Sequence, residues 1–205
     1  TNTYSIPGTY DLRIRVEDTH GQADWGVYNE QADAWAAPVT HYVSSSGSST
    51  PPYGSWATAA NSVQDALDIA QNGSMVVLDA ETFTTSGTLI IDKAITLLGP
   101  DSNPASATLD AGGTHRCLVI GNPYAAVRDL TVTGGFANQY GGGIYAPSGG
   151  FISNCVIRGN SCQYSGGSEK YGGVGVYLAS GRLQHSTLSS NTTIYTQYGG
   201  GAMLI

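Results

Sequence analysis

A repeat in the last third of the chain most restricts the fold. The triplet Tyr-Gly-Gly occurs at 140–142, 171–173 and 198–200, and a strand-like segment precedes each copy, at 127–132, 152–157 and 183–188. The segments begin 25 and 31 residues apart, and the triplets advance with them. A period of this length is typical of solenoids and propellers, in which each repeat buries its apolar face only against its neighbours.

The lengths between the repeated elements favour a solenoid over a β-sandwich. Counted from three residues after each strand-like segment to the next Tyr-Gly-Gly, the chain spends 4, 10 and 6 residues, at 136–139, 161–170 and 192–197. A stack of coils tolerates insertions at one corner, whereas a sandwich gives no reason for a fixed insertion site. We therefore predict that Val127, Ile152 and Leu183 lie in one vertical file, and that Asn160 and Asn191 share a repeat position and hydrogen-bond between coils.

From residue 75 onward, short apolar runs alternate with turn residues, which predicts strands without intervening helices. The predicted runs are 75–78, 89–91, 95–98, 107–109, 117–120, 127–132, 144–145, 151–157, 174–178, 183–188 and 203–205. One helix is predicted at 62–70, because Val63, Ala66, Leu67 and Ala70 follow the helical period. Ser62 and Asp65 have the spacing of a capping box.

The N-terminal part has a different pattern. Apolar residues alternate with polar ones from Tyr10 to Val16, which predicts a half-buried strand. The run from Pro7 to Gly21 resembles the last strands of PKD-type and related immunoglobulin-like modules of extracellular proteins. We assign residues 1–21 to such a module, 22–52 to a connecting segment and 53–205 to the repeat domain. Both ends of the chain pass through recognisable units, so we expect a segment of a longer protein.

Composition excludes some functions. The chain has 8 basic and 15 acidic residues and a net charge of -7, so we expect no nucleic-acid partner, since binding to phosphates needs a basic patch. No apolar run is long enough for a membrane span. The residues Cys117, Cys155 and Cys162 have no metal-ligand spacing. Cys155 is expected as a small buried hydrophobe, with a Cys155–Cys162 disulfide as the alternative.

The repeat region resembles a family of secreted bacterial proteins. The features that carry the likeness are 51–60, 63–67, Gly99, 109–110, 130–135, 154–160 and the glycine triplets, and they are similar to those of right-handed parallel β-helix repeat proteins. This resemblance implies an all-β, right-handed parallel β-helix in which the helix at 62–70 caps the first coil. It also implies an extracellular or cell-surface location. The family includes polysaccharide lyases and hydrolases as well as adhesins, so the activity stays open.

Few residues suggest chemistry. Carboxylates are sparse after Asp110, where only Asp129 and Glu169 follow, and no catalytic residue is assigned. Asp79 and Glu81, two apart on one face of a strand, are candidates for weak cation binding, with Ca²⁺ the cation considered and no other cofactor or metal expected. Asp129 is expected to form an ion pair with Arg128 or across coils, and Asp110 to form an Asx-turn.

The 13 tyrosines are the other candidates. Tyr140, Tyr171 and Tyr198 occupy the same place in the repeated triplet, so a column that stacks on sugar rings is one interpretation and packing over the glycine corner is the other.

The sequence favours a structural or adhesive segment without its own catalytic site. Its partners would be an extracellular glycan or a neighbouring surface protein. A first alternative is a polysaccharide lyase or glycoside hydrolase with its site at the acids of 75–110 or beyond residue 205. A second is a carbohydrate-binding face along the tyrosine column.

Overall fold

The computed structural model describes residues 9–17, 23–33, 38–163, 172–194 and 201–205. The chain divides into two compact units, at Thr1–Pro38 and Val39–Ile205. In the first unit, the strands β1 (Thr9–Glu17) and β2 (Ala23–Asp33) form an antiparallel pair. The strand predicted from the alternation of Tyr10 to Val16 is confirmed, and β2 lies in the segment predicted to be a connection.

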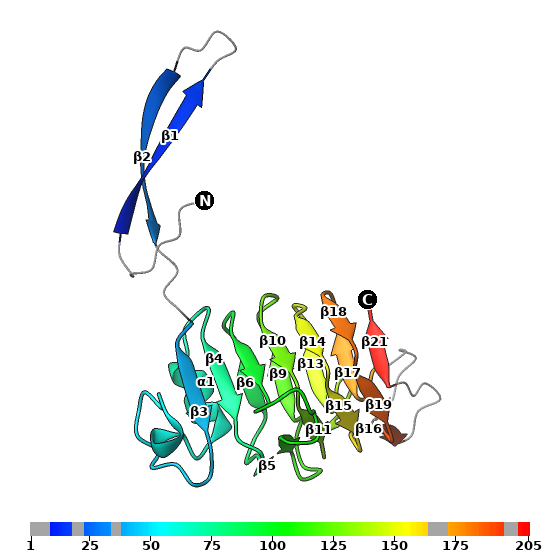
Figure 1. Cartoon of the computed structure of the whole chain (residues 1–205). Coiled ribbons are helices and arrows are strands. Elements are labelled where there is room, and N and C mark those ends of the chain that lie inside the picture. Colours follow the sequence, from blue (N-terminus) through cyan, green and yellow to red (C-terminus); the bar gives the residue numbers. More distant parts are fainter. Residues whose placement is uncertain (1–8, 18–22, 34–37, 164–171, 195–200) are drawn as a thin grey trace. The chain divides into compact units, whose positions relative to one another are not determined.

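The second unit is a parallel β-helix (Figure 1). Its chain winds repeatedly through four parallel sheets, so each sheet holds one short strand from successive coils. The first sheet contains β3 (Thr40–Val43), β4 (Met75–Leu78), β7 (Thr96–Leu98), β10 (Ala126–Arg128), β14 (Phe151–Ser153) and β18 (Arg182–Gln184). The second contains β5 (Thr82–Thr84), β8 (Thr108–Asp110), β11 (Thr131–Thr133), β15 (Val156–Arg158) and β19 (Thr187–Ser189).

The two remaining sheets complete the coils. The third sheet appears only in the later coils and contains β12 (Phe136–Ala137), β16 (Ser161–Gln163) and β20 (Thr192–Ile194). The fourth contains β6 (Leu89–Ile91), β9 (Leu118–Ile120), β13 (Ile144–Ala146), β17 (Val176–Leu178) and β21 (Ala202–Leu204). The segments of variable length at 136–139, 161–170 and 192–197 begin with the strands of the third sheet, which the sequence did not predict.

The vertical file predicted from the repeat is confirmed. Val127 pairs with Ile152 between β10 and β14, and Ile152 pairs with Leu183 between β14 and β18. The side chains of Val127 and Ile152 are fully buried, and Leu183 packs against the same core. The repeat therefore places one aliphatic side chain above the next through three coils.

Each repeated six-residue segment contains a corner that the sequence did not reveal. These segments were predicted as single strands, but Asp129, Asn154 and His185 separate β10 from β11, β14 from β15 and β18 from β19. The three residues have positive φ angles of 59°, 50° and 49°. Asn and Asp adopt this left-handed conformation more readily than most residues, because their short polar side chains can hydrogen-bond locally.

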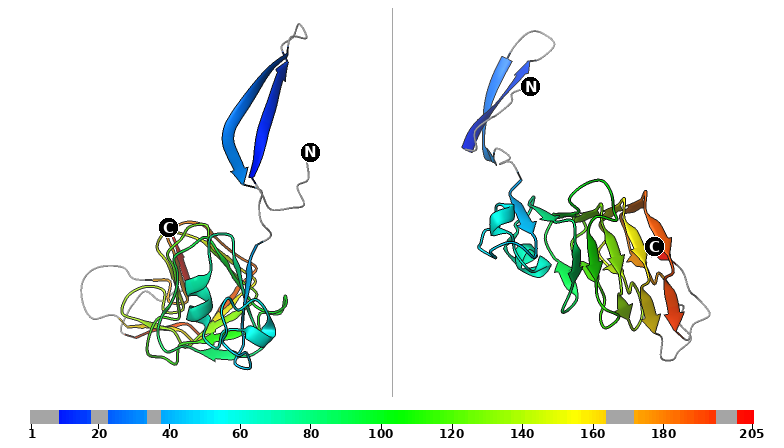
Figure 2. Two further views of the ribbon diagram at one scale, coloured as in Figure 1. Left: turned by 90° about the vertical axis from the view of Figure 1, so that its left-hand side faces the viewer. Right: turned by 60° about the horizontal axis from the view of Figure 1, so that its bottom comes forward.

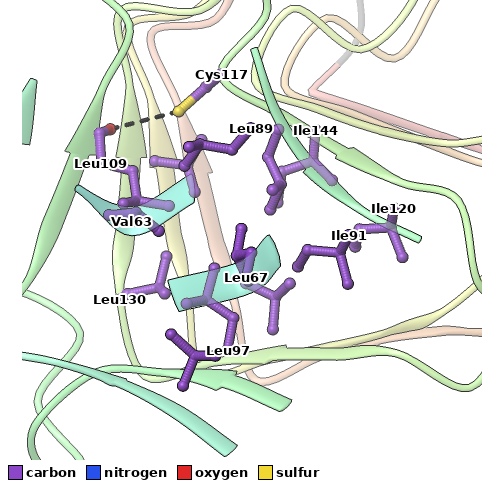
Figure 3. Close-up of a cluster of buried hydrophobic side chains, with 14 of the residues drawn as sticks. Val63, Leu67, Leu89, Ile91, Leu97, Leu109, Cys117, Ile120, Leu130 and Ile144 are labelled. Carbon is purple, nitrogen blue, oxygen red and sulfur yellow. Dashed lines mark hydrogen bonds between the residues drawn. The ribbon is translucent and has the colours of Figure 1, made fainter. Parts of the chain in front are cut away.

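The helix α1 (Val63–Ile69) closes the N-terminal end of the stack. Figure 2, in its left-hand view, shows α1 lying across the end of the coils. Val63, Ala66 and Leu67 are buried, and Figure 3 shows Val63 and Leu67 among the core side chains of the first coils. A cap of this kind covers apolar residues that would otherwise be exposed at the open end of the solenoid.

The repeat domain begins earlier than predicted. The strand β3, in the segment assigned to a linker, pairs in parallel with β4 from Thr40 to Val43. The loop that follows it is held by the side chain of Asn61, whose Nδ2 donates to the carbonyl oxygens of Ser44 and Gly47, both at 2.9 Å. The described β-helical unit therefore starts at Val39 rather than at residue 53.

The predicted capping box is wrong in its position. Ser62 is the N-cap residue of α1, but its side chain makes no capping hydrogen bond. A capping box is present upstream of α1, on the short 3₁₀ helix η1 (Trp56–Thr58), where Ser55 Oγ accepts from Thr58 N and Thr58 Oγ1 accepts from Ser55 N.

The Ser55→Ala substitution is expected to lower the free energy of unfolding by about 1 kcal/mol, because it removes a capping hydrogen bond. Ser62→Ala serves as the matched control and is expected to change it by less than about 0.5 kcal/mol, since no capping bond is lost. Urea denaturation of both variants measures the difference. Equal effects of the two substitutions would contradict this assignment of the caps.

Most of the core is one continuous apolar cluster that runs through the stack, and Ala137, Cys162 and Val174 form a second, small cluster. The largest fully buried side chains of the core come from different coils and include Leu78, Leu97, Leu109, Leu118, Leu130, Ile144, Ile152 and Ile157. Figure 3 shows such residues converging from the first, second and fourth sheets.

In the part of the chain that the structure describes, no helix is long and apolar enough to cross a membrane.

Candidate functional site

Of the three tyrosines in the repeated triplets, the structure describes one. Tyr140 is described and half-buried, whereas Tyr171 and Tyr198 lie outside the described residues. The register pairs Ile144 with Val176, and Gly141 N donates to Gly173 O at 2.9 Å. With the same offset, Gly172 stands opposite Tyr140 in the next coil. The predicted column of Tyr140, Tyr171 and Tyr198 stays a prediction, because two of its members lie outside the described residues.

The glycines after the tyrosines leave room for an asparagine ladder. The side chain of Asn160 is fully buried, and its Nδ2 donates to Asn191 Oδ1 in the next coil at 3.0 Å. Cβ atoms at Gly143 and Gly175 would approach the side-chain nitrogens of Asn160 and Asn191 to 2.9 and 2.7 Å. The predicted stacking of the two asparagines is confirmed, and it explains why the repeat has glycine at this corner.

A different pair of tyrosines forms an aromatic column. Tyr145 and Tyr177 are the middle residues of β13 and β17, pair with each other in register, and point outward between buried neighbours. Their ring centroids lie 5.2 Å apart with an angle of 32° between the planes. The ring of Tyr140 lies 4.7 Å from that of Tyr177. These separations lie in the range of favourable aromatic pairs.

Arg116 lies against this column. Its Cζ is 4.5 Å from the ring centroid of Tyr145, which is a cation–π geometry. Its Nε donates to Gly141 O and its Nη2 to Tyr140 O, both at 2.9 Å. Burial lowers the pKa of Arg116 from its ordinary value, and the nearby Cys162 and Tyr145 oppose that change. Among the described residues, no carboxylate lies within ion-pair distance of this guanidinium.

Aliphatic side chains extend the column along the outer face of the fourth sheet. In register with Tyr145 and Tyr177, β6, β9 and β21 place Ile90, Val119 and Met203 at the same position. Ile90 is 50% exposed, and the other four side chains are half-buried. We call these five residues together with Arg116 the tyrosine–arginine face.

Sequence reasoning missed this face although its signal was present. In the segments 144–146 and 176–178, a tyrosine stands between two aliphatic residues. In a strand with a buried inner face, that alternation turns the middle residue outward. The Tyr-Gly-Gly triplets drew the prediction to Tyr140 instead, and Arg116 is brought to the column only by the turn of the coil.

Asp79 and Glu81, the predicted cation ligands, both bind the loop after β3. Ser44 Oγ donates to Asp79 Oδ2 at 2.9 Å, and Ser45 N donates to Glu81 Oε1 at 2.6 Å. Glu81 also lies in the wall of a groove of about 450 Å³, which the residues Asn61, Ser62, Phe83 and Thr85 help to line. No group of three or more His, Cys, Asp or Glu side chains with metal-binding geometry occurs within the described ranges.

Two other acids have the local roles expected from the sequence. Asp110 Oδ1 accepts from Gly112 N at 2.9 Å, as in the predicted Asx-turn. Asp129 lies 4.0 Å from Arg128 Nε and accepts a hydrogen bond from Asn154 Nδ2 at 2.7 Å. Asp129 thus connects one coil to the next at the left-handed corner.

All three cysteines are free and buried, so the alternative of a Cys155–Cys162 disulfide is wrong. Cys117 Sγ lies 3.7 Å from Leu109 O, the contact drawn as a dashed line in Figure 3. Burial raises the pKa of the Cys117 thiol to about 12 and that of Cys155 to about 11, and it also raises the pKa of Cys162. Buried thiols of this kind are chemically inert, because the thiolate is the reactive form.

These raised pKa values predict a loss of stability at alkaline pH. The unfolded chain releases the thiol protons near the ordinary pKa of 9.0, whereas the folded chain holds them to about 11 and about 12. The unfolded state then binds fewer protons, so the free energy of unfolding falls as the pH rises from 9.0 through these values. Urea denaturation across this range is expected to show a smaller decline for a Cys117→Ala, Cys155→Ala variant. An unchanged slope would contradict the assignment.

Comparisons of the chain with protein-family models, with curated proteins and with solved structures found no match.

Proposed function

We propose that the chain is a structural and adhesive segment of an extracellular or cell-surface protein, in which the β-helix serves as a stiff support. The observation that carries this proposal is the continuous parallel register of the first sheet, from β3 to β18. Each inner strand of that sheet pairs with the coil above and with the coil below. A solenoid built in this way has no internal domain boundary at which it could bend easily.

Side-chain bonds between coils support the same proposal. Asn154 Nδ2 donates to Asp129 Oδ1 at one corner, and Asn160 Nδ2 donates to Asn191 Oδ1 at another. Asn191 Nδ2 in turn donates to Ile157 O in the preceding coil at 2.9 Å. These contacts connect neighbouring coils in addition to the strand pairing, so the coils resist sliding and separation.

The adhesive part of the proposal rests on the tyrosine–arginine face. Tyrosine and arginine supply large contact areas and directional hydrogen bonds at protein interfaces. Here they stand on rigid strands, since Tyr145 and Tyr177 pair in register within the fourth sheet. A stiff support with such a face suits a protein that holds a partner at the cell surface.

The enzymatic alternative needs two cooperating carboxylates. Cleavage of a glycosidic bond uses carboxyl groups about 5 to 10 Å apart that face the same bond. Within 75–110, Asp79 and Glu81 accept hydrogen bonds from Ser44 and Ser45, and Asp110 accepts one from its own turn. These contacts favour structural roles for the three acids.

Incubation with polyuronates and with neutral polysaccharides tests the proposed function against the enzymatic one. New reducing ends and unsaturated products are measured for the wild type and for an Asp79→Asn, Glu81→Gln variant. The proposal predicts no product from either protein. Product formed by the wild type and absent with the variant would overturn it.

A further inference from the structure

We propose that the tyrosine–arginine face docks an acidic segment of a partner protein, in which a carboxylate binds Arg116 and flanking apolar side chains lie along the column. This inference rests on the proposed adhesive role and adds the chemistry of the partner. It is carried by three features of the face, namely the charge of Arg116, the paired tyrosine rings and the aliphatic residues in line with them.

The charge of Arg116 calls for an anionic group. Two backbone carbonyl oxygens accept from Nε and from one N–H of Nη2. Both N–H groups of Nη1 and the second N–H of Nη2 therefore have no hydrogen-bond acceptor among the described residues. A guanidinium binds a carboxylate through two parallel hydrogen bonds, and such bonds are about twice as strong as neutral ones. The contacts to Tyr140 O, Gly141 O and the Tyr145 ring already fix the orientation of the side chain, so little rotational freedom is lost on binding.

The two tyrosines supply the apolar part of such a contact. Residues that contribute most to protein interfaces are enriched in Tyr, Trp and Arg, and they cluster together. Tyr145 carries Arg116 on its ring and packs 5.2 Å from Tyr177 on the adjacent coil. The face therefore combines a fixed positive charge with rigid aromatic surface.

The aliphatic residues favour a protein over a glycan. Ile90 and Val119 precede the tyrosines in the column, and Met203 follows them. A sugar chain that ran along this column would place hydroxyl groups over side chains that offer no hydrogen bonds, which is unfavourable for buried polar groups. A peptide with apolar side chains on both sides of an Asp or Glu matches the column in polarity and in charge.

Selection from a displayed library of random peptides tests the proposal. The wild-type chain is the bait, and a Tyr145→Ala, Tyr177→Ala variant removes peptides that bind elsewhere. Enriched peptides are expected to carry Asp or Glu between apolar residues. Replacing that acidic residue by Asn or Gln in a synthetic peptide is expected to weaken binding at least about tenfold. This change leaves the protein intact, so misfolding cannot imitate the result.

The protein variants complete the design. Arg116→Gln is expected to weaken binding of the same peptide at least tenfold or so, whereas Arg158→Gln and Tyr124→Ala, which change exposed residues off this face, leave it unchanged. Thermal denaturation checks that each variant is folded. No enrichment, enrichment without acidic residues, or binding of polyuronate in place of peptides would overturn the inference. None of these outcomes would bear on the structural part of the proposed function, which the incubation with polysaccharides tests separately.

Discussion

Replacing Asn160 by alanine is expected to lower the free energy of unfolding by about 3 to 5 kcal/mol, because it leaves several buried polar groups without a partner. Asn160 Oδ1 accepts from Gly135 N at 2.8 Å, and its Nδ2 donates to Val132 O at 3.2 Å. The same Nδ2 bonds Asn191 in the next coil. The substitution thus removes bonds to two neighbouring coils at once.

Two further variants separate hydrogen bonding from packing in this prediction. Asn138→Ala changes an exposed asparagine in the same region and is expected to alter stability by less than about 0.5 kcal/mol. Asn160→Leu fills a similar volume but cannot make the bonds, so it is expected to be about as unstable as Asn160→Ala. Urea denaturation measures all three proteins. Recovery of stability in Asn160→Leu would show that packing, rather than the ladder, holds this corner.

The Gly99→Ala substitution is expected to cost at least about 2 kcal/mol through overlap of backbones between coils. Gly99 N donates to Arg128 O at 3.0 Å, which brings the two chains close together. A Cβ atom at Gly99 would overlap the carbonyl oxygen and carbon of Asp129. Asp129 sits at a left-handed corner with a φ of 59°, and its side chain bonds Asn154 in the next coil. It therefore cannot move away without breaking the stack.

Gly87→Ala is the matched control for this prediction. A Cβ atom at Gly87 would meet nothing within 4 Å, and its φ is not in the left-handed region. The substitution is expected to leave stability within about 0.5 kcal/mol of the wild type. Chemical denaturation of the two variants gives the comparison. A cost for Gly99→Ala no larger than that for Gly87→Ala would contradict the close approach of these coils.

The repeat predicted the stacked coils because residues at the same position of successive repeats lie one above the other. Val127, Ile152 and Leu183 pair as expected, and so do Asn160 and Asn191. Corners within the repeat were harder to recognise. Asp129, Asn154 and His185 bend the chain with positive φ, but none of them is glycine or proline, so the six-residue runs resembled unbroken strands.

The candidate site was less predictable for a physical reason. The glycines that leave room for the asparagine ladder, Gly143 and Gly175, lie outside the Tyr-Gly-Gly triplets on which the sequence-based prediction was built. Arg116 contacts Tyr145 because the coils bring the two residues together, although they are far apart in the sequence. The local sequence around either residue gives no sign of this contact.

The central claim, that successive coils lie in register one above the other, is tested most directly by methyl contacts in nuclear magnetic resonance spectra. The structure predicts strong nuclear Overhauser effects between the methyl groups of Val127 and Ile152, and between those of Ile152 and Leu183. Assigned spectra without these effects would contradict the parallel β-helix. So would spectra in which a soluble probe reaches the methyl groups of Val127 and Ile152, because the structure buries both side chains.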